Sequence, residues 1–116
     1  SAVDILHNDC RTIPVMQGTE TLLCGTEKIY YLESVDKHTY VYTKDCCYET
    51  RYRLYELEDM LHMQCLRCSK AMIVNIRKIK SVKAELNGRM IAELLNGEQI
   101  IISRAYVKEL KRKLGI

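Results

Sequence analysis

The chain has 116 residues, enough for one domain with its own hydrophobic core and too few for several. Its hydrophobic content of 47% and charged content of 28% are ordinary for a globular domain, and no apolar run approaches the roughly 18 residues of a membrane span. The net charge of +3 hides an asymmetry: residues 1–65 carry 6 basic and 11 acidic side chains, whereas residues 66–116 carry 12 and 4. This asymmetry predicts a second half that faces a polyanion, although a solvated basic surface is the simpler interpretation of charge alone.

The first half of the chain predicts short strands joined by tight turns. The polar residues 1–11 predict an N-terminal extension or linker remnant, so the folded domain is expected over residues 12–116. Side chains that alternate with a period of two, between clusters of turn residues, indicate strands. This pattern predicts strands at residues 12–16, 21–24, 29–34, 39–43 and 46–50.

A change of period predicts a helix over residues 53–63. Leu54, Leu57 and Leu61 recur at helical spacing and would form its buried face. After it, residues 65–68 predict a short strand, and residues 72–76 predict a turn of helix or a buried connector.

The next segment predicts a meander of three antiparallel strands. Two Asn-Gly pairs interrupt it, and Asn-Gly accepts the positive φ angles of a tight hairpin turn. The turns are Asn87-Gly88 and Asn96-Gly97, and the strands are expected at residues 81–86, 89–95 and 99–103.

An amphipathic helix is predicted at the end of the chain. Ser103 can cap its start through the side-chain hydroxyl. Val107, Leu110 and Leu114 would form its buried stripe. The opposite face is basic, with Lys108, Lys111, Arg112 and Lys113.

Three motifs in this order resemble the LytTR family of bacterial DNA-binding domains. They are the apolar strand IYYLES at residues 29–34, the basic loop and apolar stretch RCSKAMIVN at residues 67–75, and the turn LNGE at residues 95–98 followed by ISRAY at residues 102–106. The resemblance covers roughly residues 12–114, nearly the whole chain.

The resemblance implies a mainly β fold, elongated and built of small antiparallel sheets with two or three short flanking helices. It implies a cytoplasmic, sequence-specific regulator of transcription that binds double-stranded DNA by placing loops in successive major grooves. Family sites are usually imperfect direct repeats, which implies a homodimer on DNA. An upstream receiver domain or another partner outside this chain is also possible, and no membrane is expected as a partner.

Three loops of this chain match the loops by which the family contacts DNA. The first supplies Lys37, His38 and Thr39, on a predicted hairpin tip. The second supplies Arg67, Ser69 and Lys70, of which Lys70 is the strongest candidate. The third, at the start of the last helix, supplies Arg104 and Lys108; a helix N-terminus also favours phosphate through its free N–H groups.

Some of these residues also have purely structural interpretations. The first loop would otherwise be an ordinary exposed hairpin. Arg67 could instead be the partner of a carboxylate, and Lys108 could lie on a solvated helix face. Asn75 is expected to be a buried cap or turn residue rather than a DNA contact.

The chain departs from the family pattern at several positions within these motifs. Ser69 stands where the family usually has His, and Ala71 stands where it usually has Ser. Ala105 occupies a position where family members often carry a second basic residue. Cys65 and Met72 stand where aromatic residues are usual. The losses at Ser69, Ala71 and Ala105 motivate one rival function, a protein-interaction domain of the same fold without DNA binding.

Six cysteines motivate a second rival, a metal or redox sensor. Cys65 and Cys68 form a CxxC pair, and a zinc site would need the fold to add ligands from Cys46, Cys47 and His62. The cysteines mostly lie in apolar segments, which favours reduced, buried thiols in the cytosol. No metal and no cofactor is therefore predicted.

Catalysis finds little support in the sequence. The chain has no glycine-rich phosphate-binding loop and no HExxH motif, and its three histidines have no evident nucleophile partner. The chain is therefore not expected to be an enzyme.

Overall fold

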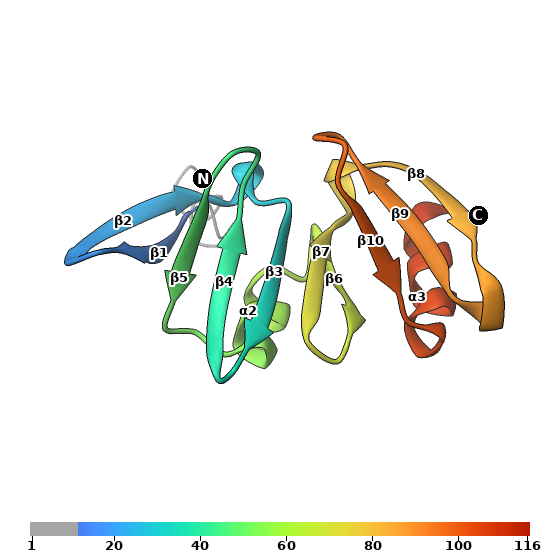
Figure 1. Ribbon diagram of the computed structural model, residues 1–116, viewed down its shortest axis with the longest axis horizontal. Coiled ribbons are helices and arrows are strands. Elements are labelled where there is room, and N and C mark those ends of the chain that lie inside the picture. Colours follow the sequence, from blue (N-terminus) through green and yellow to red (C-terminus); the bar gives the residue numbers. More distant parts are fainter. Residues whose placement is uncertain (1–11) are drawn as a thin grey trace, which may run out of the picture.

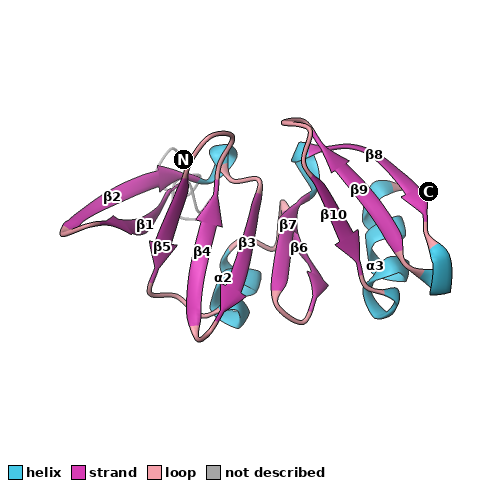
Figure 2. Cartoon of the chain, viewed as in Figure 1, coloured by secondary structure: helices cyan, strands magenta, loops and turns pink. Residues whose placement is uncertain are grey.

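A computed structural model describes residues 12–116 of the chain, and these residues form a mainly antiparallel β fold (Figures 1 and 2). The predicted N-terminal extension, residues 1–11, lies outside the described residues. No helix within residues 12–116 has the length and apolar character needed to cross a membrane. The strands are β1 (Thr12–Gln17), β2 (Glu20–Gly25), β3 (Tyr31–Val35), β4 (His38–Tyr42), β5 (Cys47–Thr50), β6 (Cys65–Ser69), β7 (Met72–Asn75), β8 (Ile79–Ala84), β9 (Met90–Leu94) and β10 (Gln99–Ile102). The helices are η1 (Thr26–Lys28), α2 (Leu54–Met60), η2 (Ile76–Lys78), η3 (Leu86–Gly88) and α3 (Arg104–Leu114).

The strands form two sheets along the longest axis of the molecule. The larger sheet has seven strands in the order β2-β1-β5-β4-β3-β7-β6, and the smaller has three in the order β10-β9-β8. The hairpin of β1 and β2 projects from one end, α2 lies behind β3 and β4, and α3 lies behind the smaller sheet (Figure 1). The expected mainly β fold of antiparallel sheets with flanking helices is confirmed.

The segment after the second predicted loop corrects the sequence analysis. Residues 72–76 were predicted as a turn of helix or a buried connector, but Met72–Asn75 is strand β7. Its two central residues, Ile73 and Val74, are β-branched and completely buried, pairing with Leu32 and Tyr31 of β3. Burial on both faces removes the alternation that usually marks a strand, so a short apolar run of this kind is ambiguous in sequence.

Ser103 also behaves differently from the prediction. It occupies the N-cap position of α3, but its hydroxyl makes no capping hydrogen bond. Its backbone N–H instead donates to the Cys68 carbonyl at 2.9 Å, which ties the start of α3 to β6.

Two hairpin turns contain two consecutive residues with positive φ. The β3–β4 turn uses Asp36 at φ 50° and Lys37 at φ 69°, two consecutive left-handed residues as in a type I′ turn. Asn87 and Gly88 also both have positive φ, as predicted for an Asn-Gly turn. In the β9–β10 turn only Gly97 has a positive φ, of 90°.

The buried side chains form two hydrophobic clusters, and β3 contributes to both. Leu32 belongs to the first cluster, which also contains the buried face of α2. Tyr31 belongs to the second, which contains Leu110 of α3 and the inner face of the smaller sheet. The Tyr31 ring stacks on Tyr42 with 4.3 Å between centroids, and its hydroxyl donates to Glu98 at 2.8 Å. Tyr31 therefore connects the two sheets.

Asn75 lies where the chain leaves the seven-stranded sheet, and its side chain is 1% exposed. Its Nδ2 donates to the Ile29 carbonyl at 2.7 Å, and its Oδ1 accepts from the Arg77 N–H at 3.0 Å. Its backbone N–H donates to the Tyr30 carbonyl at 3.0 Å. The prediction of a buried cap or turn residue is confirmed, because Asn75 caps η2 and joins it to the two residues that precede β3.

Replacement of Asn75 by Ala should lower the free energy of unfolding by about 2–4 kcal/mol, because it leaves the buried Ile29 carbonyl without its side-chain donor. Urea denaturation measures the change. Asn96→Ala is the matched control: that amide contacts Glu98 in an exposed turn, and its loss should cost less than about 1 kcal/mol. Equal losses for the two variants would contradict the role given to Asn75.

Candidate nucleic-acid interface

The three loops predicted to contact DNA lie along one edge of the molecule, the lower edge in Figure 1. We call this the contact edge and define it by residues 36–38 of the β3–β4 turn, residues 69–71 of the β6–β7 turn and residues 103–105 at the start of α3. Backbone hydrogen bonds join neighbouring loops. Ser34 N–H donates to the Ala71 carbonyl at 2.8 Å, and Ser103 N–H donates to the Cys68 carbonyl at 2.9 Å. The three loops therefore form one continuous structural unit.

The first loop exposes a cation and an imidazole. Lys37 lies at the hairpin tip with a left-handed backbone, and its side chain is exposed. His38 is exposed too, and its Nδ1 lies 2.7 Å from Oε2 of Glu49 on the adjacent strand β5. This contact fixes the direction of the ring.

Thr39, the third residue predicted in this loop, is only 4% exposed. It is the second residue of β4 and pairs with Ser34 and Thr50 on either side. Because successive side chains of a strand point to opposite faces, an exposed His38 places Thr39 inside. Thr39 is therefore a packing residue in this structure and does not present its hydroxyl at the contact edge.

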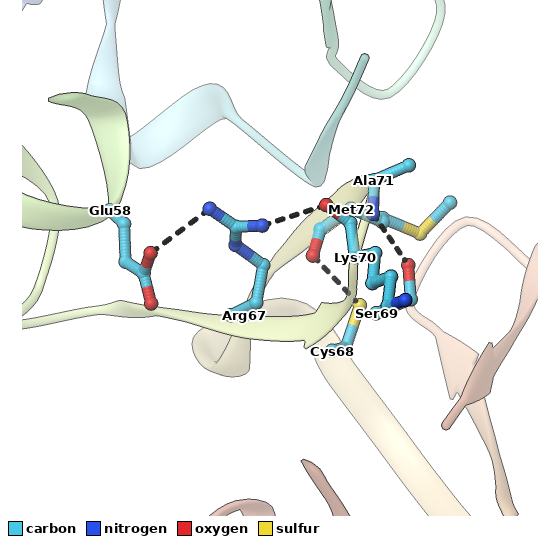
Figure 3. A network of polar contacts seen from close by, with 7 residues as sticks. All are labelled: Glu58, Arg67, Cys68, Ser69, Lys70, Ala71 and Met72. Atoms are coloured by element: carbon cyan, nitrogen blue, oxygen red, sulfur yellow. Dashed lines mark hydrogen bonds and ion pairs between the residues drawn. The ribbon is translucent and has the colours of Figure 1, made fainter. Parts of the chain in front are cut away.

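Arg67 is built into the second loop (Figure 3). Its Nη1 donates to the Lys70 carbonyl at 2.7 Å, and its Nη2 pairs with Oε1 of Glu58 on α2 at 3.1 Å. The side chain is only 18% exposed, so these contacts are partly shielded from water. The alternative interpretation of Arg67, as the partner of a carboxylate, is confirmed. The guanidinium braces the loop that carries Lys70 against α2.

The other two candidate residues of this loop differ in whether their side chains have hydrogen-bond partners. The Ser69 hydroxyl accepts a hydrogen bond from the Ala71 N–H at 3.3 Å and so helps to close the turn. Lys70 is exposed, and within residues 12–116 its ammonium has no hydrogen-bond or ion-pair partner. Figure 3 shows Lys70 at the tip of the hairpin, on the backbone that Arg67 holds.

The third loop places Arg104 at the first turn of α3. Its stem crosses Gly88 of the β8–β9 turn so closely that a Cβ on Gly88 would lie 2.8 Å from Arg104 Cδ. Gly88 thus has a second role besides its positive φ, because it leaves room for Arg104. Lys108 is exposed one turn further along the same helix.

Sequence reasoning missed two residues that shape the contact edge. The sequence predicts no contact for Glu58 and places Gly88 only in a turn. Neither contact has a sequence signal, because Glu58 is nine residues from Arg67 and Gly88 is sixteen from Arg104. The first contact follows from the packing of α2 beside β6, and the second from the packing of α3 against the β8–β9 turn.

The CxxC pair is divided between the two hydrophobic clusters. Cys65 packs in the first and Cys68 in the second. Burial raises the pKa of both thiols to about 12 from an ordinary value of 9.0, which disfavours the thiolate that metal binding and redox exchange require. Within residues 12–116 no three His, Cys, Asp or Glu side chains are grouped so as to hold a metal ion. The structure therefore gives both cysteines a packing role.

Thiol alkylation at neutral pH should modify the exposed Cys46 and Cys47 and leave Cys65 and Cys68 unmodified until the protein is unfolded. Mass spectrometry of native and urea-treated protein measures this.

The raised pKa values of Cys65 and Cys68 also make the stability depend on pH. The unfolded chain loses these protons first, so the free energy of unfolding should fall as the pH rises from about 9 toward 12. Rapid native modification of Cys65 would contradict the packing role.

Replacement of Arg67 by Lys should lower the free energy of unfolding by about 1–2 kcal/mol, because one ammonium cannot reproduce the two directed contacts of the guanidinium. Chemical denaturation measures the loss. Arg77→Lys, at an exposed arginine, serves as control and should change stability by less than about 0.5 kcal/mol. An unchanged stability for Arg67→Lys would mean that the brace contributes nothing.

Comparison with known proteins agrees with this geometry. A solved LytTr DNA-binding domain from Bacillus cereus superimposes with a TM-score of 0.85 at 26% sequence identity, covering 91% of this chain and 98% of that one. The sensory transduction protein LytT of Enterococcus faecalis is 27% identical over 105 residues, which are 90% of this chain and 43% of that protein. An uncharacterized HTH-type transcriptional regulator of Staphylococcus aureus is 29% identical over 97 residues, covering 84% of this chain and 66% of that protein.

The chain spans only part of these curated relatives, from 43% to 66% of their length. In this chain strands β6 to β10 lie between α2 and α3, so these two helices do not form a helix-turn-helix unit. The family of LytTr DNA-binding domains matches residues 19–115, which include all three loops of the contact edge. On the match of sequence and fold, the chain belongs to the LytTR family of DNA-binding domains.

Proposed function

We propose that this domain binds double-stranded DNA in a sequence-specific manner and regulates transcription, using the contact edge as its DNA-binding surface. The observation that carries the proposal is the placement of three loops, distant in sequence, along one edge and joined by two backbone hydrogen bonds. Membership of a family of DNA-binding domains supports it. An edge braced by the fold also loses little conformational entropy when it binds a rigid duplex.

The exposed side chains of the contact edge have the chemistry that DNA recognition needs. Lys70 is the candidate for a base contact, because a lysine ammonium can donate to the O6 and N7 acceptors of guanine in the major groove. Lys37 and His38 form the second candidate group. Arg104 and Lys108, at the start of a helix, are suited to phosphate oxygens, which attract both cations and free helix N–H groups.

The dimensions of the domain support contact with successive major grooves. Its Cα atoms extend over 42 × 37 × 24 Å, and the contact edge follows the longest direction (Figure 1). One turn of B-form DNA is about 34 Å long, so the domain is long enough to lie along a full turn. Loops at different points of the edge then meet different grooves on one face of the duplex.

We also propose the setting in which the domain works. Two copies would bind the two half-sites of a direct repeat as a homodimer on DNA, and the protein would act in the cytoplasm. The relatives are longer than this chain, which supports a further domain, such as a receiver domain, in the protein that carries it. The activating signal would then reach the DNA-binding domain through that second domain.

Selection of bound sequences from a random duplex library tests the proposal, with affinities then compared at low and moderate salt. Enrichment of a direct repeat, with half-sites about one helical turn apart, is the expected result. Binding that depends on salt but enriches no sequence would indicate a nonspecific basic domain. The absence of binding at either salt concentration would contradict DNA binding and favour the protein-interaction alternative that the losses at Ser69, Ala71 and Ala105 motivate.

Lys70→Ala should weaken binding to the selected site by about 1–3 kcal/mol if Lys70 contacts a base, with a smaller effect on unrelated DNA. Electrophoretic mobility shifts on both sequences measure the difference. Lys44→Ala is the matched control: this exposed lysine lies in the β4–β5 turn, at the opposite edge of the molecule in Figure 1, and its loss should leave affinity unchanged. An equal loss on all sequences would make Lys70 a phosphate contact, and no loss would remove the second loop from the interface.

A further inference from the structure

We propose that the loop between β5 and α2, residues 51–53, is a fourth DNA contact, which binds backbone phosphates flanking the site reached by the three loops. The proposal rests on the proposed DNA-binding function and adds Arg51 and Arg53 to the interface. Neither residue belongs to the motifs by which the chain resembles its family.

Strand register places this loop at the contact edge. Strands β4 and β5 are antiparallel, with Thr39 opposite Thr50. Continuing this register by one residue puts Arg51 level with His38, the exposed residue that begins β4. In Figure 1, β5 runs toward the contact edge, and the chain then follows that edge to α2.

The backbone on both sides of the loop is fixed by contacts within the fold. Thr50 is 3% exposed, and its hydroxyl donates to the Pro14 carbonyl at 3.1 Å. At the other end, the Arg53 N–H donates to Oε1 of Glu56 at 2.9 Å, which fixes the first turn of α2. The loop is therefore held in place where it crosses the edge.

The two guanidinium groups of this loop are free. Arg51 and Arg53 are both exposed, and within residues 12–116 neither side chain has an ion-pair or side-chain hydrogen-bond partner. In contrast, Arg67 and Arg112 are paired with carboxylates. Two guanidinium groups without partners, held on a fixed loop, offer N–H donors to phosphate oxygens. Arginine can bind such oxygens in a bidentate manner.

The loop lies at one end of the series of loops along the contact edge. The order of strands in the larger sheet places β5 outside the β3–β4 hairpin, on the side away from β6, β7 and α3. The sequence of contacts along the edge is then residues 51–53, 36–38, 69–71 and 103–105. The arginine loop is at the end of this series, so it meets DNA beyond the segment contacted by the first hairpin.

Two duplexes carrying the selected site test this inference, one trimmed close to the site and one extended by half a helical turn on both sides. Binding of the full chain is measured over a range of salt concentrations for the wild type, Arg51→Ala and Arg53→Ser, which keeps a good N-cap residue for α2. Lys44→Ala, at the other end of β5, is the control for loss of an exposed cation. Arg51→Lys tests rescue by a point charge.

On the extended duplex, each variant should bind more weakly than the wild type, and the slope of log affinity against log salt should fall by about 1 for each lost phosphate contact. On the trimmed duplex the variants and the wild type should bind equally, and the relative preference among sequences should not change. Arg51→Lys should restore most of the slope. Thermal unfolding that matches the wild type shows that the variants are folded.

If the wild type binds the extended duplex and the variants bind it with unchanged affinity and salt slope, the fourth contact is overturned. The proposed function then remains intact. Wild-type protein that binds no DNA would overturn both. A change of sequence preference in Arg51→Ala would also overturn the proposal as stated, because it would indicate contact with a base rather than a phosphate.

Discussion

The buried amide of Asn75 is the interaction on which the arrangement of the two sheets depends. It contacts the segment between η1 and β3 through the Ile29 carbonyl, and it contacts η2 through the Arg77 N–H. The seven-stranded sheet ends and the path to the smaller sheet begins at this point. Because the hydrogen bond to Ile29 is buried and the one from Arg77 is partly buried, rotation of one sheet against the other would leave polar groups unsatisfied. The loops carried by the two sheets consequently keep a fixed spacing.

Further contacts within the fold hold the loops of the contact edge, and with them the backbone that carries the exposed side chains. Backbone hydrogen bonds link the loops, Arg67 braces the loop of Lys70, and Gly88 leaves space for Arg104. One element carries strain, because Asp36 and Lys37 adopt the left-handed conformation that a type I′ turn normally assigns to Asn and Gly. A residue with a long cationic side chain at this position costs stability and places a charge at the hairpin tip.

Much of the fold could be predicted from the sequence because its turns are local. The Asn-Gly pairs and the period-two segments marked most of the strands, and leucine spacing marked α2. Strand β7 could not be identified, because its short apolar run, residues 72–74, is buried on both faces and has no periodicity. The candidate site was predictable to the level of loops. It was not predictable to the level of side chains, since the burial of Thr39 depends on where β4 begins and the pairing of Arg67 depends on a helix nine residues away.

Mapping of backbone amide shifts by NMR during titration with the selected duplex tests the central claim most directly, because it reports on every loop without altering the protein. The account predicts that the largest shifts occur at Lys37, Lys70 and Arg104, on the contact edge. Residues Lys44 and Asn96, in turns at the opposite edge of Figure 1, should change little. Shifts concentrated at that opposite edge, or on the β1–β2 hairpin, would contradict the assignment of the DNA-binding surface.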